Sequence, residues 1–184
     1  NRIKAAANRA EYEKIVKEEL GINFVPTVTK QNIDFVRNST AQISDNVFEN
    51  LKEKKEKFIA GVDYYHNHTG GSVDYIGADT DGSNIYGLYN EDMNADLNVG
   101  LGFSVGHFYA DYDDDSYINQ TVAQAYIPVA FEKEDFAFVS MPWFGAGRGF
   151  YKRKVDSEGK HKADMTSYYY GVSNQARKEF SYAA

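Results

Sequence analysis

The stretch ADLNVGLGFSVGHFY, residues 95–109, alternates between two kinds of side chain with a period of two. Large apolar residues fill one set of positions, and small or polar residues fill the other. This alternation is typical of a β-strand with two different faces, because apolar residues on a helix recur every three or four positions. The apolar set is Leu97, Val99, Leu101, Phe103 and Val105, and the small set is Asn98, Gly100, Gly102, Ser104 and Gly106.

The small, polar face of this strand has two explanations. Membrane β-barrel strands place apolar residues toward lipid and polar residues toward a hydrated lumen, so the apolar set would be lipid-facing and the small set lumen-facing. In a soluble or periplasmic β-barrel, the apolar set would instead face a core or a cavity that binds a small apolar ligand. Gly and Ser make poor walls for such a cavity, but they suit a lumen occupied by a helix.

The composition favours a β-rich protein and argues against several classes of function. The 184 residues include 15 Tyr, 12 Phe and 15 Gly but 3 Pro, which fits an all-β protein with many turns. The formal net charge of -7 argues against a nucleic-acid partner, and the lack of Cys excludes disulfides and thiolate chemistry. Because the chain begins at Asn1 without a signal peptide, we expect an internal piece of a longer precursor.

Two helices are predicted before the β-rich part. Residues 1–20 are rich in Ala, Glu and Lys, and we expect residues 1–29 to form a helical linker at the end of a passenger region, extended around Pro26. A second, pore-type helix is predicted over residues 30–57. Its apolar stripe, at spacings of three and four, is Ile33, Val36, Thr40, Ile43, Val47 and Leu51. Its middle turns carry Asn38, Ser39, Gln42, Ser44 and Asn46, so it could pack on a core or lie in a hydrated lumen.

The remaining sequence predicts strands joined by connections of alternating length. The expected strands are 58–65, 83–89, 95–109, 121–131, 136–150 and 168–180. The connections 67–82, 111–119 and 151–165 are long, whereas 90–94 and 132–135 are short. All long connections would therefore lie at one end of the strands, as in outer-membrane barrels. We predict an all-β, antiparallel, up-and-down outer-membrane β-barrel that is partial, with about six strands, preceded by N-terminal helices.

In this order of elements, the chain resembles the β-barrel translocator domain of bacterial autotransporters from about residue 31 to residue 182. The resemblance is carried by GADTDGSNIYGLY (77–89), LNVGLGFSVGHFYADYD (97–113) and TVAQAYIPVAFEKEDFAFVSMPWFGAGRGFYKR (121–153), which follow a helix. It implies a barrel of about twelve strands in the cell outer membrane, threaded by a helix that leads to a secreted passenger domain. The implied partners are outer-membrane lipid, the chain's own passenger and the barrel-assembly machinery.

Two features depart from that family's pattern. Only about six strands are predicted, so residues 58–184 would be the first half of a barrel. The sequence also ends at Ala184 without the C-terminal aromatic strand by which the family is recognised for membrane insertion. We therefore expect a fragment, because an isolated half barrel leaves an open edge that lipid cannot satisfy.

Residues with metal-binding or catalytic chemistry occur, but their spacing does not form a site. Asp111, Asp113, Asp114 and Asp115 could bind a cation or form a solvated loop. The segment that starts at Asp79 has Leu88 where a calcium loop needs Glu, and His66 and His68 lack a third ligand. No nucleophile elbow, P-loop or dinucleotide fingerprint is present. We predict no enzymatic activity, no catalytic residue, no metal and no cofactor.

Three further groups have alternatives that the sequence leaves open. Lys152, Arg153 and Lys154 could meet anionic lipopolysaccharide head groups or be solvated. Some autotransporters cleave their passenger within the pore helix, where this chain has Asn32, Asn38 and Asn46, but nothing distinguishes one of the three. Candidates for interfacial aromatic girdles, or else for a soluble core, are Tyr64, Tyr65, Tyr86, Tyr89, Tyr109, Tyr112 and Trp143.

Overall fold

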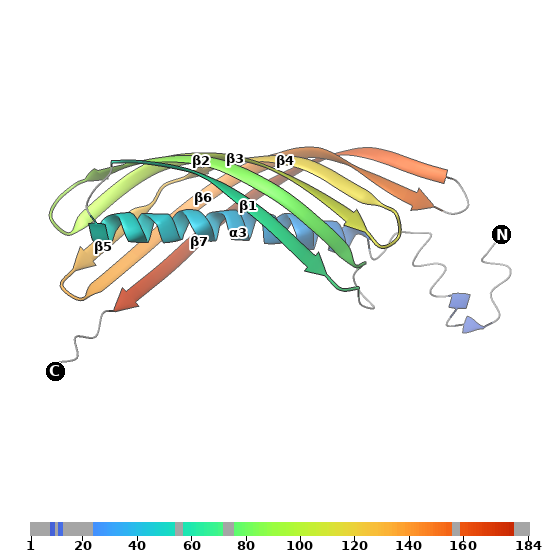
Figure 1. The fold of residues 1–184 in the computed structure, drawn as a ribbon, viewed down its shortest axis with the longest axis horizontal. Coiled ribbons are helices and arrows are strands. Elements are labelled where there is room, and N and C mark those ends of the chain that lie inside the picture. The colour runs from blue at the N-terminus through green and yellow to red at the C-terminus, as the bar shows by residue number, and fades with distance from the viewer. Residues whose placement is uncertain are drawn as a thin grey trace.

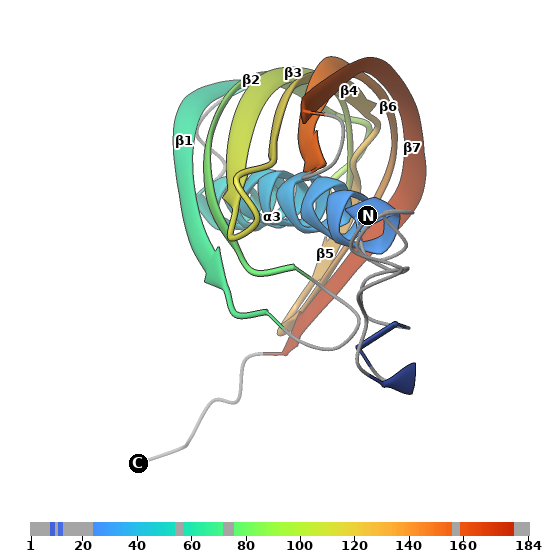
Figure 2. The same ribbon diagram turned by 90° about the vertical axis from the view of Figure 1, so that its right-hand side faces the viewer.

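The chain folds as one curled antiparallel sheet around a long helix (Figures 1 and 2). The computed structural model describes residues 8–9, 11–12, 24–53, 57–71, 76–155 and 159–178. The long helix is α3 (Phe24–Glu53), and the seven strands in this part of the chain are β1 (Phe58–Thr69), β2 (Ala78–Asp92), β3 (Leu97–Tyr112), β4 (Tyr117–Tyr126), β5 (Val129–Lys133), β6 (Phe136–Val155) and β7 (Gly159–Lys178). The predicted antiparallel β fold is confirmed.

β4 and β5 lie end to end between β3 and β6. β3 pairs with β4 through residues 102–111 and, in the same register, with β5 through residues 97–99. β6 pairs with β4 through residues 143–152 and, in the same register, with β5 through residues 136–140. The pairings β3–β4, β4–β6, β6–β5 and β5–β3 therefore form a closed cycle. The prediction of about six strands is wrong by one in the described ranges, because Pro128 has no N–H and divides the expected strand 121–131.

β1 and β7 are the two edges of the sheet. Across the described residues, β1 pairs with β2 alone and β7 pairs with β6 alone. Figure 2, viewed along α3, shows β1 and β7 on opposite sides of the helix, with the sheet curving over it from one to the other. The concave face of the sheet therefore covers one side of α3 and leaves the other side uncovered by strands.

The strands are longer than predicted, and the expected difference in connection length is wrong. Half of 67–82 and most of 111–119 and 151–165 is strand, and the connection 113–116 is as long as the connection 93–96. Gly, Asp and Asn in these segments resemble turn sequences, but they pair across strands. His66 contacts Asp81, and His68 contacts Asp79, at 2.8 and 2.7 Å between imidazole Nδ1 and carboxylate oxygen. Such cross-strand pairs stabilise strand ends that composition alone assigns to loops.

α3 begins before the predicted start at residue 30, within the segment expected to be an extended link. Pro26 lies in the first helical turn, where backbone N–H groups have no partner within the helix, so its missing N–H costs nothing. The prediction of a helix over residues 1–20 lies outside the described residues except at 8–9 and 11–12. In the part of the chain that the structure describes, no helix has both the length and the hydropathy needed to cross a membrane.

The buried face of α3 repeats every four residues and not at the alternating spacing predicted. The buried pairs are 27/28, 31/32, 35/36, 39/40, 43/44 and 47/48. A helix turns by about 400° in four residues, so each pair is rotated by about 40° from the last and the buried face winds around the helix. Phe35 and Phe48 are therefore buried, whereas Ile33, predicted to face the core, is 54% exposed.

Candidate functional site

The two sets of side chains predicted for residues 95–109 lie on opposite faces of β3. Gly100, Gly102, Ser104 and Gly106 are buried on the face toward α3, and Asn98 on the same face is partly exposed and donates to Asp92 Oδ1 at 3.1 Å. Leu101, Phe103 and Val105 are exposed on the convex face. Leu97 and Val99, at the start of the strand, are partly exposed.

The convex face carries a continuous belt of exposed apolar side chains, called the outer belt below. The strand register brings Val62, Ile85 and Val105 side by side across β1, β2 and β3. The belt continues across β6 and β7, where Phe144 lies opposite Tyr170. Its large members, each at least half exposed, are Val62, Ile85, Leu101, Phe103, Val105, Phe144, Tyr168, Tyr170 and Val172.

The concave face is shaped by glycines that admit a large side chain from α3. The Phe35 ring lies against Gly82 and Gly106, where an added Cβ would be 2.7 Å from ring carbons in both cases. The ring centroids of Phe35 and Phe108 are 4.9 Å apart. Gly102 has a different role, because a Cβ there would lie 2.7 Å from Leu88 Cδ1 and not against the helix.

Hydrogen bonds between polar side chains tie α3 to the sheet along its length. Thr80 Oγ1 donates to Gln31 Oε1 at 2.9 Å, and Ser39 Oγ donates to Gln124 Oε1 at 3.0 Å. Further along the helix, Asn46 Nδ2 donates to the Tyr86 hydroxyl at 2.5 Å. The interface is thus held by buried polar groups as well as by the apolar clusters around Phe35, Ile43 and Val47.

The polar residues predicted for the middle of the helix divide between its two sides. Ser39 and Ser44 are buried against the sheet, whereas Gln42 is exposed on the opposite side. Of the three candidate asparagines, Asn32 accepts a hydrogen bond from the Tyr169 hydroxyl, Asn46 bonds Tyr86, and Asn38 is partly exposed.

Several buried polar atoms on this interface have no protein partner among the described residues. They are Gln31 Nε2, Ser44 Oγ, Asn84 Oδ1, Gln120 Oε1 and Gln124 Nε2. In proteins such groups typically bond ordered water, because leaving each one unsatisfied would cost about 1–3 kcal/mol. The helix–sheet interface therefore combines buried polar groups with apolar clusters.

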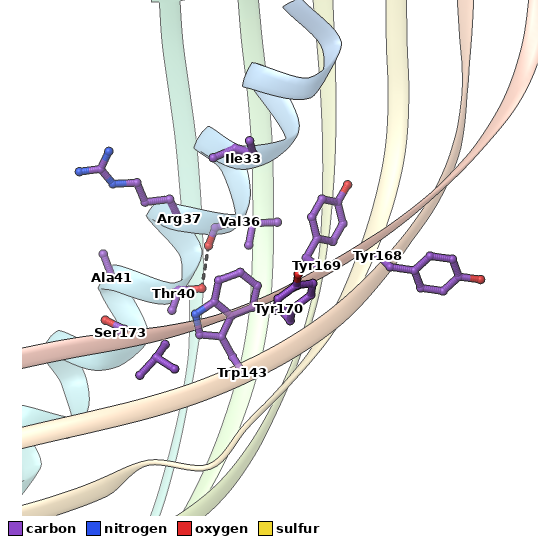
Figure 3. Close-up of a pocket in the computed structure, with 11 residues that line it drawn as sticks. Ile33, Val36, Arg37, Thr40, Ala41, Trp143, Tyr168, Tyr169, Tyr170 and Ser173 are labelled. Atoms are coloured by element: carbon purple, nitrogen blue, oxygen red, sulfur yellow. Dashed lines mark hydrogen bonds between the residues drawn. The ribbon is translucent and has the colours of Figure 1, made fainter. Parts of the chain in front are cut away.

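A groove of about 590 Å³ runs between the uncovered side of α3 and the β6–β7 edge (Figure 3). Trp143 points toward the helix near Thr40, while the Arg37 guanidinium extends away from the groove. The other lining residues are mainly apolar or aromatic: Ile33, Val36, Ala41, Tyr168, Tyr169, Tyr170, Val172 and Ser173.

The acidic and histidine residues considered for metal binding lie apart or in pairs. Within the described ranges, no group of three His, Asp or Glu side chains could hold a metal ion. Asp111 accepts a hydrogen bond from the Tyr109 hydroxyl at 2.7 Å, and Asp114 accepts one from the Ser116 N–H at 3.0 Å in the turn between β3 and β4.

At the opposite end of the sheet, Lys57 donates a hydrogen bond to Glu91 at 2.6 Å, and this bond raises the pKa of Lys57.

Beyond the outer belt, the convex face carries a row of aromatic rings with two lysines above it. Tyr109 and Tyr117 have ring centroids 5.6 Å apart, and Phe150 follows at 6.0 Å from Tyr117. Lys152 Nζ lies 5.8 Å from the Tyr117 centroid, and Lys162 Nζ lies 4.1 Å from the Phe150 centroid. Sequence reasoning missed Lys162, because this residue falls in a segment predicted to be a loop.

The predicted aromatic girdle and basic group are each split between the two faces. Tyr64, Tyr89 and Tyr109 lie on the convex face, but Tyr65, Tyr86, Tyr112 and Trp143 lie on the concave face near α3. Lys152 is on the convex face, Arg153 alternates to the other face, and the side chain of Lys154 lies outside those described.

No family model, curated protein or solved structure matches this chain.

Proposed function

We propose that this chain is part of an outer-membrane β-barrel translocator that exports and anchors an N-terminal passenger domain. In this role the outer belt contacts lipid, and α3 occupies the lumen along the route by which the passenger left. The partners are outer-membrane lipid, the passenger itself and the barrel-assembly machinery that inserts such proteins. The concave face would form the lumen wall, with Asn98, Gly100, Gly102, Ser104 and Gly106 facing α3.

The observation that carries this proposal is the outer belt, with polar residues at both of its ends. On β3 the belt, taken to include the partly exposed Leu97 and Val99, runs from Leu97 to Val105 and is bounded by Asp96 and His107. Those residues span roughly 27 Å of strand at about 3.4 Å per residue. With the strand tilt of about 40° common in membrane barrels, this is roughly 21 Å along the axis, close to their usual apolar band of about 25 Å. Soluble monomers rarely expose a contiguous apolar surface of this extent.

The second candidate function is binding of a small apolar ligand by a soluble or periplasmic β-barrel. The groove beside α3 favours it, because its volume and its Trp143 and Tyr169 walls fall in the range of ligand sites. The inside of the curled sheet offers less support, since α3 packs against the concave face there. This candidate also leaves the outer belt exposed to water.

The two candidates differ in what the outer belt touches, which arginine substitutions can test. We expect Leu101→Arg to lower the free energy of unfolding in lipid vesicles by about 2–4 kcal/mol, because it places a charge near the bilayer midplane. The control is His107→Arg, on the same strand and face but past the end of the belt, where the cost is about 0–1 kcal/mol. If both variants stay in the soluble fraction and unfold like the parent chain, the membrane proposal is wrong.

Orientation and export are tested in cells that express the full-length gene. Asp114→Cys lies in the turn between β3 and β4, and Asp135→Cys lies in the turn between β5 and β6 at the opposite end of the sheet. A translocator with the turn at 113–116 outside the cell should react with an impermeant maleimide on whole cells at position 114 and not at 135. The native chain has no Cys, so the parent protein gives the background. Labelling at 135 alone would reverse the topology.

A further inference from the structure

We propose that Lys152, Lys162 and Arg148 form a site on the convex face that binds the phosphate of an anionic lipid head group. This inference rests on the proposed membrane location and adds a lipid class to it. The site lies at the β6–β7 side of the sheet, beyond the outer belt.

The site contains a cross-strand pair of like charges. Lys152 and Lys162 lie directly opposite each other on β6 and β7, and both occupy the convex face. Like charges in this arrangement destabilise a sheet unless an anion lies between or near them. Among the described residues, neither lysine forms an ion pair, and Arg148 forms none either.

The neighbouring carboxylates do not neutralise this cluster. Asp164 lies opposite Phe150 on the same face, and Asp111 lies opposite Tyr117. Asp111 accepts the Tyr109 hydroxyl, and Asp164 makes no ion pair with the three cations in the described structure. The three positive charges are therefore available to an anion from outside the protein.

Aromatic rings hold the two lysines in place without neutralising them. Phe150 lies between Arg148 and Lys152 along β6, and Lys162 Nζ lies over its ring. Lys162 is paired with Lys152 in the register, but its ammonium group lies over Phe150, which is two residues closer to the outer belt along β6. Cation–π contact fixes an ammonium group without neutralising it, so its charge stays available to a second partner.

The position of the site on the sheet selects a lipid as the source of the anion. Arg148 lies opposite Thr166 on β7. Thr166 is two residues from Tyr168, the last belt residue on this side, which corresponds to roughly 7 Å along the strand. In the proposed orientation this is the depth at which lipid head groups meet the barrel. The β1–β2 side of the same end carries Asp79 and Asp81, each paired with a histidine, so the anion site is confined to β6 and β7.

The test measures lipid binding to the full-length protein in neutral detergent, because this chain is proposed to form only part of the barrel. Phosphatidylglycerol and phosphatidylcholine are titrated separately, and bound lipid is counted by native mass spectrometry. We expect tighter binding of phosphatidylglycerol, and an increase of about fivefold in its Kd for each of Lys152→Gln and Lys162→Gln. Binding should weaken in 1 M salt, where the Debye length is about 3 Å. Lys133→Gln, an exposed lysine on the same face at the other end of the belt, is the matched control and should leave the Kd unchanged.

The outcomes separate this inference from the proposed function when flotation of the same proteins with vesicles is measured in parallel. A parent chain that floats with vesicles but binds both lipids equally overturns the lipid site alone. Equal effects of Lys133→Gln and Lys152→Gln would also overturn it, since they would reflect net charge only. A full-length protein that floats with neither phosphatidylglycerol nor phosphatidylcholine vesicles overturns the membrane location and the lipid site together.

Discussion

Replacing Phe35 with alanine tests the packing of α3 against the sheet more directly than any other single substitution. Phe35 is 2% exposed and reaches into the concave face between Gly82 and Gly106. Its ring also contacts Tyr65, edge to face, with centroids 6.3 Å apart. Ile33, two residues earlier, is the matched control, because the predicted apolar stripe placed it on the buried face whereas the structure places it on the uncovered side of the helix.

The expected loss for Phe35→Ala is about 4–5 kcal/mol, the upper half of the range of about 3–5 kcal/mol measured for buried Phe to Ala. A value in the upper half is expected because the backbone at Gly82 and Gly106 belongs to paired strands and cannot move in to fill the space. The ring pair with Phe108 accounts for about 0.5–1.5 kcal/mol of this loss. Ile33→Ala should change the free energy of unfolding by less than about 1 kcal/mol.

Gly106→Ala probes the same contact from the sheet. The added methyl would lie 2.7 Å from Phe35 Cζ and 3.0 Å from Cε1, so the stiff ring must move, at a cost of about 1–3 kcal/mol. In a Phe35→Ala background both ring contacts are absent and Asn84 Oδ1, at 3.1 Å, is the remaining close neighbour, so most of this cost should disappear. The coupling energy of the two substitutions should then exceed about 1 kcal/mol.

The assay is guanidinium unfolding of the four variants and the parent chain in one detergent, with the m-values compared to verify that the folded states expose similar surface. A loss below about 1 kcal/mol for Phe35→Ala, or an equal cost of Gly106→Ala in both backgrounds, would refute the packing described here. Equal losses for Phe35→Ala and Ile33→Ala would favour the straight apolar stripe over the winding one.

Three further predictions concern the interface and the helix. Thr80→Val removes the donor to Gln31 while keeping the shape, and should lower the free energy of unfolding by about 1–3 kcal/mol, whereas Thr121→Val on the convex face should change it little. Lys57→Gln breaks an exposed ion pair with Glu91 and should lower the free energy of unfolding by less than about 1 kcal/mol in the same assay. A larger loss would mean that the pair is shielded from solvent. Deleting residues 31–52 from the full-length protein should raise single-channel conductance in planar bilayers, and unchanged conductance would place the helix outside the conducting path.

The alternation in residues 95–109 predicted β3 well because it depends on a local rule. Side chains of a strand point to opposite faces whatever the tertiary fold, so Gly102 and Leu101 were certain to separate once a strand formed. A polar interface in the middle of the helix could also be predicted from the sequence. Ser39 and Ser44 occupy buried positions that a dry core would fill with apolar residues. These inferences needed no knowledge of strand order.

The features that sequence reasoning missed depend on partners distant in sequence. Which side of α3 is buried follows from the twist of the sheet, so Phe35 could not be chosen over Ile33 from helical spacing alone. The predicted end of β1 was wrong for the same reason, because His66 and His68 lie in the strand by pairing with aspartates on β2. The break at Pro128 was readable in principle, since proline cannot donate to a ladder.

The small residues of the concave face do not by themselves distinguish a membrane barrel from a soluble one. Side chains converge on the inside of any strongly curved sheet, so Gly and Ser are favoured there in water and in lipid alike. Curvature makes no demand on the convex face, where side chains diverge and polar residues would fit equally well. The choice of Ile85, Leu101 and Phe103 at exposed positions therefore needs another cause. In the proposed translocator, lipid would supply it, because polar residues return at Asp96 and His107, where an apolar layer of limited height would end.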